Sequence, residues 1–370
     1  MIPVNQPLLG AEEKRLLTEC INSGWVSSDG PFVNEFEQKF AGYIGTKYGI
    51  AVSSGTAALE TALYAAGVGK GDEVIMPSFT IISCALAAIR LGAVPVLVDA
   101  EPDTWNMDVS CIERRVTSKT KAIMPVHIYG HPVDMDPVLS IARKHGLVVI
   151  EDAAEAHGAE YRGKKCGSLG HISAWSFYAN KIITTGEGGM VLTSNRKMAR
   201  RAASYRNLCF LPGRRFYHKE LGYNFRITNM QAAIGVAQLS RIEESIRIKR
   251  MLGEYYREKL GNIKGIKCQT ERPWAKSVYW MYCIELDKKL GLNASQMMAA
   301  LLKRGIDTRP FFLGLHLQPA LRSLGLFRKE RYPVTERIGR QGLYLPSGLA
   351  LSKKQIDKVV SAIKMIIRGH

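Results

Sequence analysis

The sequence lacks the features that mark membrane and secreted proteins. Its most apolar stretch, residues 81–91, is interrupted by Ser83, Cys84 and Arg90, and no uninterrupted apolar run approaches the length of a membrane-spanning helix. The first residues do not join a basic region to an apolar one, so no signal peptide is expected. Together these absences predict a soluble protein of the cytoplasm with no membrane partner.

Paired cysteines are also missing. The seven cysteines are odd in number and widely scattered, which argues against a disulfide framework. None belongs to a Cys-x-x-Cys pair, and the nearest His and Cys, His157 and Cys166, have no further ligands at metal spacing. We therefore expect no metal site.

Acidic residues are few relative to basic ones. The chain has 33 Asp and Glu against 51 Lys and Arg, for a formal net charge of +18. Such an excess is typical of nucleic-acid-binding proteins, but it also attracts small anionic substrates. The basic residues are spread along the chain, with short clusters only at 200–201, 214–215 and 247–250. We favour an anionic small substrate and expect no nucleic-acid partner; a basic nucleic-acid-binding or regulatory protein is the alternative.

What the chain does contain is an alternation of short β-rich runs with helical segments. The strands expected in its first half are 48–53, 73–77, 95–98, 121–126, 147–150 and 172–177. This alternation predicts an α/β fold with a mixed, mostly parallel sheet that helices cover on both faces. One long helix is expected from Asn229 to about Leu260, and a strand from Val278 to Leu286.

The length and a change of pattern predict two domains. A chain of 370 residues exceeds one ordinary domain, and from about Gly261 the parallel α/β pattern gives way to an α+β one. We predict a large α/β domain over residues 1–245, with the N-terminal segment, and a smaller C-terminal α+β domain over residues 246–370.

Candidate site residues fall where the predicted strands end, which is where parallel sheets bind ligands. Gly55 and Thr56 follow a strand and begin a helix, so their backbone N–H groups and the helix dipole suit a phosphate. Small residues also cap most helices, which is the alternative. Asp152 ends an apolar strand and either pairs with a cationic ring nitrogen or caps the turn that begins at Ala153.

Lys181 stands between a Ser/aromatic run, Ser176–Tyr178, and a Gly-Glu-Gly-Gly turn, Gly186–Gly189. A lysine that is desolvated in such a place has a lowered pKa and a nucleophilic amine. Such an amine beside phosphate-binding hydroxyls suggests a Schiff base with pyridoxal phosphate. The alternative is a solvated surface lysine.

Five segments follow one another in a characteristic order. They are Ser53–Leu59 (Ser-Ser-Gly-Thr-Ala-Ala-Leu), Pro77–Thr80, Glu151–Gly158, Ser176–Gly189 and Gly222–Arg226. In this combination, which covers nearly the whole chain, they resemble the DegT/StrS nucleotide-sugar aminotransferases. The resemblance implies the pyridoxal-phosphate-dependent aspartate-aminotransferase fold (fold type I) and pyridoxal 5'-phosphate as cofactor.

The resemblance also implies roles for single residues. Lys181 matches the Schiff-base lysine, Asp152 the partner of the pyridine nitrogen, and Gly55, Thr56 and Ser176 the phosphate-binding residues.

Three further cofactor positions carry over. Glu155 matches a residue beside the cofactor's hydroxyl, and Asn224 matches an asparagine that reaches the cofactor of the neighbouring subunit, which implies a homodimer with shared active sites. Many relatives have an aromatic residue at the position of Ile81, and we expect either Phe79 or Ile81 to face the cofactor ring.

Substrate contacts are expected from loops of both predicted domains. The candidates are Trp25, Ser27, Tyr129, Arg226, Arg309 and His316. Trp25 in a polar loop is as well explained as a plug at the edge of the core. His316, like His127 and His131, is equally open to a purely structural interpretation.

The resemblance implies ping-pong transamination with L-glutamate as amino donor. The expected acceptor is the 4-keto group of a nucleotide-linked sugar, GDP-4-keto-6-deoxymannose, and the alternative is a dTDP- or UDP-linked 4-keto or 3-keto sugar. A related pyridoxal-dependent 3-dehydratase carries His in place of the lysine, so Lys181 argues against that reaction.

Overall fold

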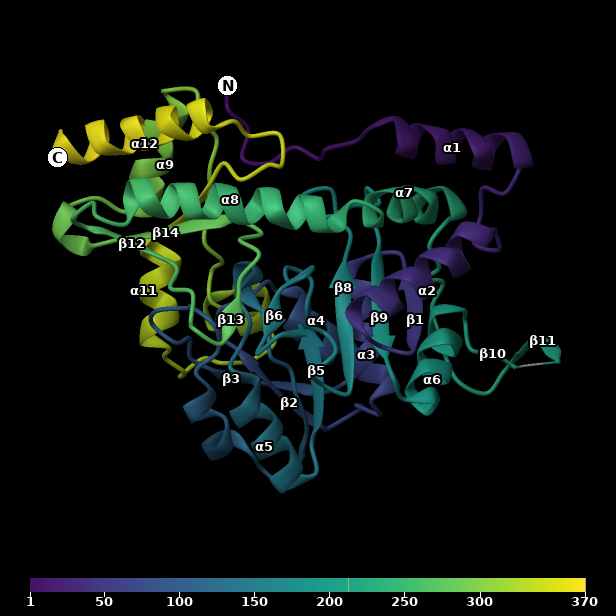
Figure 1. Ribbon diagram of the computed structural model, residues 1–370. Helices are drawn as coiled ribbons and strands as arrows, with labels where there is room; N and C mark the ends of the chain where they lie inside the picture. Colours follow the sequence, from purple (N-terminus) through teal and green to yellow (C-terminus); the bar gives the residue numbers. More distant parts are fainter. Residues whose placement is uncertain (212, 370) are drawn as a thin grey trace.

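A seven-stranded sheet forms the centre of the computed structural model, which describes residues 1–211 and 213–369 (Figure 1). Its order is β1-β9-β8-β5-β4-β2-β3. The strands are β1 (Tyr48–Val52), β2 (Glu73–Pro77), β3 (Val94–Val98), β4 (Thr120–Ile123), β5 (Val148–Asp152), β8 (Ile172–Ser176) and β9 (Gly189–Thr193). The pairs from β8 to β3 are parallel, whereas β9 runs antiparallel to both β8 and β1. The prediction of a mixed, mostly parallel sheet is confirmed.

Helices cover both faces of this sheet, because its strands are too apolar to leave either face in water. All five residues of β8 and all five of β9 are buried. The helices that follow or precede the strands are α1 (Ala11–Ser23), α2 (Pro31–Ile44), α3 (Gly55–Ala65), α4 (Ser83–Arg90), α5 (Met135–His145) and α6 (Arg196–Arg206). The small side chains of α3 let this helix pack closely on β8 and β9.

The prediction of one continuous helix from Asn229 to Leu260 is wrong. The structure has two helices, α7 (Asn229–Leu239) and α8 (Ile242–Leu260), and Thr228 caps the first of them. At the junction, the hydroxyl of Ser240 donates a hydrogen bond to the carbonyl oxygen of Ala237 at 2.7 Å. A serine that bonds to its own helix in this way competes with the backbone ladder, so the helix ends there.

The C-terminal part builds a second, antiparallel sheet. Its order is β12 (Ile266–Cys268), β14 (Tyr282–Leu286), β16 (Gly342–Leu345) and β15 (Arg309–Pro310). The helices around it are α9 (Ala294–Leu302), α10 (Pro319–Ser323), α11 (Pro333–Gln341) and α12 (Lys353–Arg368). In Figure 1, α12 lies over α8, on the side of the molecule opposite α5. The strand predicted over 278–286 begins only at Tyr282, so its first half was wrong.

Two short strand groups complete the fold. A three-stranded sheet joins β6 (Glu160–Tyr161) to β7 (Lys164–Lys165) and to β13 (Ala275–Lys276) from the C-terminal part. A hairpin of β10 (Phe210–Leu211) and β11 (Arg214–His218) extends away from the body of the molecule (Figure 1).

The main hydrophobic core draws on both parts of the chain. Side chains from the C-terminal part, among them Val278, Phe311, Leu315 and Ile338, are buried in the same cluster as the central sheet. A separate cluster lies between α8, α12 and β14. The domain boundary at 245/246 falls within the first turn of α8 and stays a prediction.

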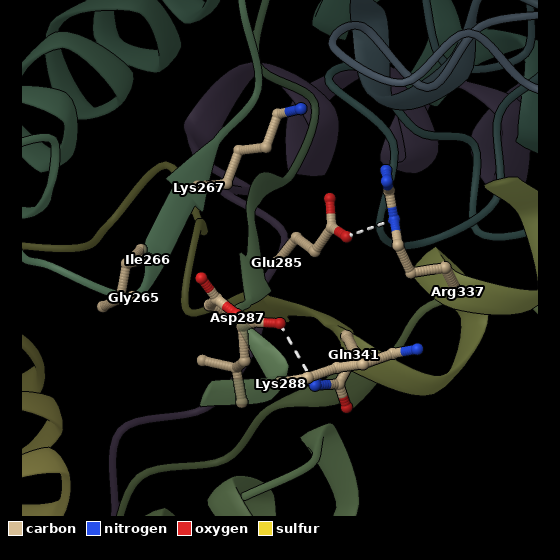
Figure 2. A pocket seen from close by; sticks show the side chains of 9 residues that line it. Gly265, Ile266, Lys267, Glu285, Asp287, Lys288, Arg337 and Gln341 are labelled. Atoms are coloured by element: carbon tan, nitrogen blue, oxygen red, sulfur yellow. Dashed lines mark hydrogen bonds and ion pairs between the residues drawn. The ribbon is translucent and has the colours of Figure 1, made fainter. Parts of the chain in front are cut away.

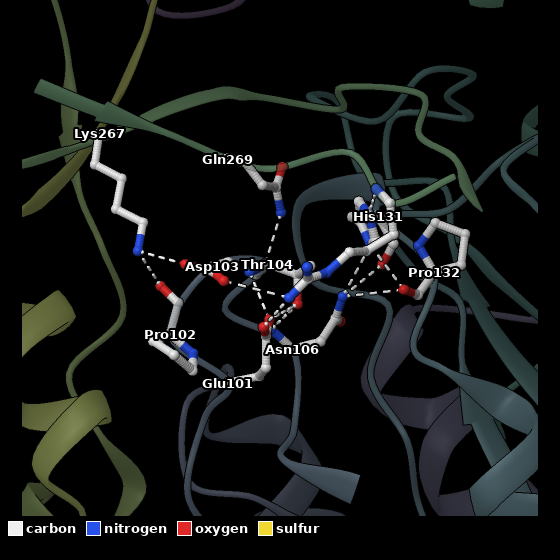
Figure 3. A network of polar contacts seen from close by, with 10 residues as sticks. Glu101, Pro102, Asp103, Thr104, Asn106, His131, Pro132, Lys267 and Gln269 are labelled. Carbon is white, nitrogen blue, oxygen red and sulfur yellow. Dashed lines mark hydrogen bonds and ion pairs between the residues drawn. The ribbon is translucent and has the colours of Figure 1, made fainter. Parts of the chain in front are cut away.

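A polar network also ties the two parts together (Figure 3). Lys267 Nζ donates to the carbonyl oxygen of Pro102 and to Asp103 Oδ1, both at 2.8 Å. Gln269 Nε2 donates to the carbonyl oxygen of Thr104 at 3.0 Å. The end of β12 is thereby fixed against the loop that follows β3.

The described residues contain no helix that is both long and apolar enough to span a bilayer. All seven cysteines are free, and six of them are buried.

Candidate active site

A cavity of about 390 Å³ opens where β5 and β8 end and α3 begins. Its walls come from strand ends, from the loop after β8 and from the C-terminal part of the chain. The lining residues are Ser54, Gly55, Thr56, Leu59, Thr80, Ile81, Ser83, Val126, Asp152, Ala154, Glu155, Ser176, Tyr178, Asn180, Lys181, Glu187, Trp280, Phe312 and Tyr344. The cavity brings together seven of the predicted cofactor residues, which are Gly55, Thr56, Ile81, Asp152, Glu155, Ser176 and Lys181. Of these, Gly55, Thr56 and Asp152 were expected there because they follow strand ends.

Lys181 reaches this cavity from the loop after β8. Its side chain is only 10% exposed, and its Nζ lies 3.7 Å from Glu155 Oε1 and 3.8 Å from the centroid of the Trp280 ring. Burial lowers the pKa of Lys181, and the carboxylates of Glu155 and Asp152 oppose this shift. Burial therefore favours the neutral, nucleophilic form of the amine more than water would.

Asp152 is the last residue of β5 and is buried. Its Oδ1 accepts a hydrogen bond from the backbone N–H of Ala154 at 3.1 Å, and its Oδ2 accepts one from Cys84 Sγ at 3.1 Å. Burial raises the pKa of this carboxyl, while its hydrogen bonds and Lys181 oppose the rise. The carboxyl caps the turn after β5, as one interpretation predicted, and also faces the cavity. Its pairing with a cationic ring nitrogen stays a prediction.

Glu155 stands on the turn after β5, between Lys181 and Tyr129. Its Oε2 accepts the backbone N–H of Tyr129 at 2.7 Å. Burial raises the pKa of Glu155 to about 7, although Lys181 opposes the shift. This carboxyl can therefore exchange a proton near pH 7.

The start of α3 forms a pocket for an anion. The Ser54 hydroxyl accepts the backbone N–H of Ala57 at 3.1 Å, and Thr56 Oγ1 donates to Ser83 Oγ at 2.9 Å. A Cβ added to Gly55 would lie 2.8 Å from Ser176 Cβ, so only glycine leaves this corner open. The free N–H groups and two hydroxyls can donate hydrogen bonds to a phosphate, and the helix dipole favours its negative charge. Together with a buried lysine and a buried carboxylate, they fit pyridoxal phosphate.

Phe79 and Ile81 have different surroundings. Ile81 is 45% exposed and lines the cavity. Phe79 is buried outside the lining, with its ring centroid 5.5 Å from that of Phe311 and 6.1 Å from that of Tyr129. Of the two residues proposed to face the cofactor, the structure places Ile81 at the cavity and Phe79 behind it.

The candidate substrate residues are not part of the cavity lining. Tyr129 is fully buried among aromatic rings, and His316 is buried with its Nε2 3.3 Å from Glu336 Oε1. These two rings pack in the interior. For His316 this agrees with the structural interpretation. Arg309 is exposed and bonds to Asp307.

The remaining candidates lie at or near the surface and do not line the cavity of their own chain. Trp25 is 51% exposed, Ser27 and Asn224 are exposed, and Arg226 is half-buried. Arg226 Nε donates to Asn224 Oδ1 at 2.8 Å, so these two side chains form one polar group.

Residues of the C-terminal part that sequence reasoning missed complete the cavity. They are Trp280, Phe312 and Tyr344. Phe312 lies three residues after the candidate Arg309, but nothing local in the sequence singles out Trp280 or Tyr344.

A second cavity, of about 420 Å³, lies on the C-terminal sheet (Figure 2). It lies beside an ion pair in which Arg337 Nε is 2.8 Å from Glu285 Oε1, with Lys267 and Lys288 nearby. It shares no lining residue with the cavity around Lys181 and contains none of the predicted catalytic groups.

Proteins of known family resemble this chain over almost its whole length. The model of the DegT/DnrJ/EryC1/StrS aminotransferase family matches residues 7–364. The chain belongs to this family. Among its relatives, the GDP-perosamine synthase of Caulobacter vibrioides is 42% identical over 370 residues, which cover 99% of this chain and 98% of the relative. The GDP-perosamine synthase of Escherichia coli O157:H7 is 39% identical, with 98% and 97% covered.

Solved structures of similar proteins share the whole fold. The aminotransferase TlmJ from Streptoalloteichus hindustanus has a TM-score of 0.93 at 31% identity, with 100% of this chain and 99% of TlmJ covered. DesV from S. venezuelae, solved with a ketimine intermediate, has a TM-score of 0.90 at 34% identity, with 96% and 94% covered. The predictions of fold type I, of an aminotransferase and of pyridoxal phosphate as its cofactor are confirmed.

Proposed function

We propose that this aminotransferase moves the amino group of L-glutamate to the 4-keto carbon of GDP-4-keto-6-deoxymannose, giving GDP-perosamine. The observation that carries the proposal is the pair of GDP-perosamine synthases that match almost end to end at 42% and 39% identity. The buried Lys181, with Asp152 and Glu155 at the same cavity, supports the transamination chemistry.

Pyridoxal phosphate supplies an aldehyde for the covalent link to an amine and a ring that withdraws electrons. Lys181 would hold its aldehyde end, Asp152 its ring nitrogen, and Gly55, Thr56 and Ser176 its phosphate. Lys181 Nζ then acts as the base that takes and returns the proton at the reacting carbon. Burial serves this role because it lowers the pKa of Lys181 and so favours the neutral form of the released amine.

Asp152 and Glu155 supply carboxyl groups at fixed positions in the site. The Asp152 carboxylate is held in place by Ala154 and Cys84, so it does not reorganise when positive charge develops near it. Glu155 lies 3.7 Å from Lys181 Nζ and can share a proton with it.

We further propose a homodimer with shared active sites in the cytoplasm. Asn224 and Trp25 are exposed and do not line the cavity of their own chain. In the dimer, Asn224 would reach the cofactor of the partner, and Trp25, Ser27 and Arg226 would contact the partner's substrate.

The test is a panel of GDP-, dTDP- and UDP-linked keto-sugars with L-glutamate, in which formation of 2-oxoglutarate is followed. We expect turnover with the GDP-linked 4-keto sugar, and none for Lys181→Ala, which also loses the visible absorbance of the bound cofactor. Use of only dTDP- or UDP-linked sugars would refute the choice of sugar and leave the chemistry standing. A protein that binds no cofactor and instead binds DNA with a steep salt dependence would be the basic regulatory protein of the alternative.

A further inference from the structure

Trp280 is the one large aromatic side chain of the described cavity lining that touches the amine of Lys181. Its ring centroid lies 3.8 Å from Lys181 Nζ, well within the range at which a cation is attracted to an aromatic face. The residue is 3% exposed, so water does not screen this contact.

Three hydrogen bonds hold Trp280 in place, one from its indole ring and two at its backbone. Its Nε1 donates to the carbonyl oxygen of Asn180, the residue before Lys181, at 2.8 Å. Its backbone N–H donates to the carbonyl oxygen of Tyr129 at 3.1 Å. Its own carbonyl oxygen accepts from Lys249 Nζ at 2.8 Å. The ring therefore presents one face to the lysine and cannot turn away without breaking a buried hydrogen bond.

Lys249 is an unusual anchor. Lys249 belongs to α8, and its amine is buried. Among the described residues it forms no ion pair and bonds only to the carbonyl oxygens of Trp280 and Ser347. A buried lysine without an acidic partner is costly, and its two hydrogen bonds tie the 280 and 347 segments to α8.

We propose that Trp280 is a positioning residue for transamination: its indole face holds the amine of Lys181 beside Glu155 whenever that amine is not covalently bound. This rests on the proposed function of Lys181. The released amine needs a defined resting place, because it must return a proton within a distance of about 3 Å. The ring supplies that place without adding a third carboxylate to Glu155 and Asp152, which would favour the charged form of the amine further.

The ionisable groups that face Lys181 are known, so the effect of the ring can be separated from theirs. Glu155 and Asp152 favour its charged form, and the buried His157 lies close enough to sense its charge. None of these groups changes when Trp280 is replaced. A change in the pKa of Lys181 in a Trp280 variant therefore measures the effect of the indole ring.

The experiment uses full-length protein loaded with pyridoxamine phosphate, a state in which the ε-amine of Lys181 is free. Competitive acetylation across pH, read by mass spectrometry, gives the pKa of Lys181. We expect Trp280→Leu to lower this pKa by about half a unit to one unit, because the cationic form loses its aromatic face. Trp280→Phe retains a weaker face and should show a smaller shift in the same direction.

Trp274→Leu is the matched control, because Trp274 belongs to the same segment and does not line the cavity. It should leave the pKa of Lys181 unchanged. In the active enzyme, the pH at which kcat falls on the acidic side should move with the labelling result, while KM for L-glutamate stays within about twofold.

An unchanged pKa in a folded Trp280→Leu or Trp280→Phe protein would overturn the proposal, and the Phe variant decides if the Leu variant does not fold. Labelling requires neither the sugar nor L-glutamate. A wrong choice of sugar therefore leaves this result readable, whereas a failure to bind the cofactor at Lys181 would remove the proposed function itself.

Discussion

At the scale of the residue, the cost of burying charge decides what this site can do. Lys181 and Lys249 are both buried lysines, but Lys181 has two carboxylates near it and Lys249 has none in the described structure. The carboxylates oppose the effect of burial on Lys181, which lies at the cavity, whereas Lys249 is held by the carbonyl oxygens of Trp280 and Ser347. The same physics yields a base in one place and a structural anchor in the other.

Lys249 makes the stability of the protein depend on pH. Burial lowers its pKa to about 7, whereas the unfolded chain keeps the usual pKa of about 10.5. Between these values the unfolded state binds the extra proton, so the free energy of unfolding rises with pH. From pH 7 to pH 9 this contribution grows by about 2 kcal/mol, and below pH 7 it is nearly constant.

The measurement is urea unfolding of the wild type and of Lys249→Met at several pH values. We expect the difference in unfolding free energy, wild type minus variant, to increase by that amount over this range. Lys264→Met, at an exposed lysine, is the control and should run parallel to the wild type. Parallel curves for Lys249→Met as well would show that Lys249 keeps its ordinary pKa in the folded protein.

At the scale of the element, the start of α3 determines whether a phosphate can enter. Gly55→Ala would push a methyl group against Ser176, since its Cβ would lie 2.8 Å from Ser176 Cβ and 3.1 Å from Oγ. We expect the Kd for pyridoxal phosphate to rise at least about tenfold, which corresponds to a loss of about 1.4 kcal/mol. The visible absorbance of the protein during cofactor titration measures this.

Gly69→Ala provides the control for that substitution, because nothing lies within 4 Å of its added Cβ. It should bind the cofactor like the wild type. Equal affinity in the Gly55 variant would mean that the phosphate does not sit at the start of α3.

Periodicity in the sequence predicted most elements of the sheet, because each is a local pattern. Residues 73–77 form the expected strand with the expected bounds. The strand predicted from Val278 was wrong because residues 278 and 280 bond instead to the carbonyl oxygens of Gly130 and Tyr129, about 150 residues earlier. A contact over that distance in the chain leaves no periodic trace.

The same distinction applies to the site. Gly55, Thr56, Asp152 and Glu155 could be predicted because strand ends of a parallel sheet meet at one edge. Trp280 and Tyr344 could not, because tertiary packing brings Trp280 from the segment before β14 and Tyr344 from β16 of the second sheet. Burial of Tyr129 and His316 was equally invisible, since it depends on rings such as Phe311 and Tyr332 that lie far along the chain.

At the scale of the whole molecule, shared active sites can be tested by mixing two inactive variants. Lys181→Ala lacks the reactive amine, and Asn224→Ala would lack the group offered to the partner. A mixed dimer contains one site with both residues intact. Random exchange of equal amounts should therefore restore about one quarter of the wild-type activity.

Mixing Lys181→Ala with Asp152→Asn is the control, because both residues line the cavity of the same chain. In the mixed dimer each of the two sites then carries one defect, and no activity should return. Restored activity in this control, or none in the first mixture, would contradict a dimer in which Asn224 crosses to the partner.

The contribution of the C-terminal part to the main core also governs how the protein is made. The last strand of the central sheet, β9, ends at Thr193, but Tyr344, which closes the cavity, is translated 151 residues later. At ribosomal speeds of about 5–20 residues per second, the nascent sheet waits about 8 to 30 s for its final covering. During that interval apolar surface that the finished enzyme buries is open to chaperones, and the coenzyme has no complete site to enter until synthesis is almost over.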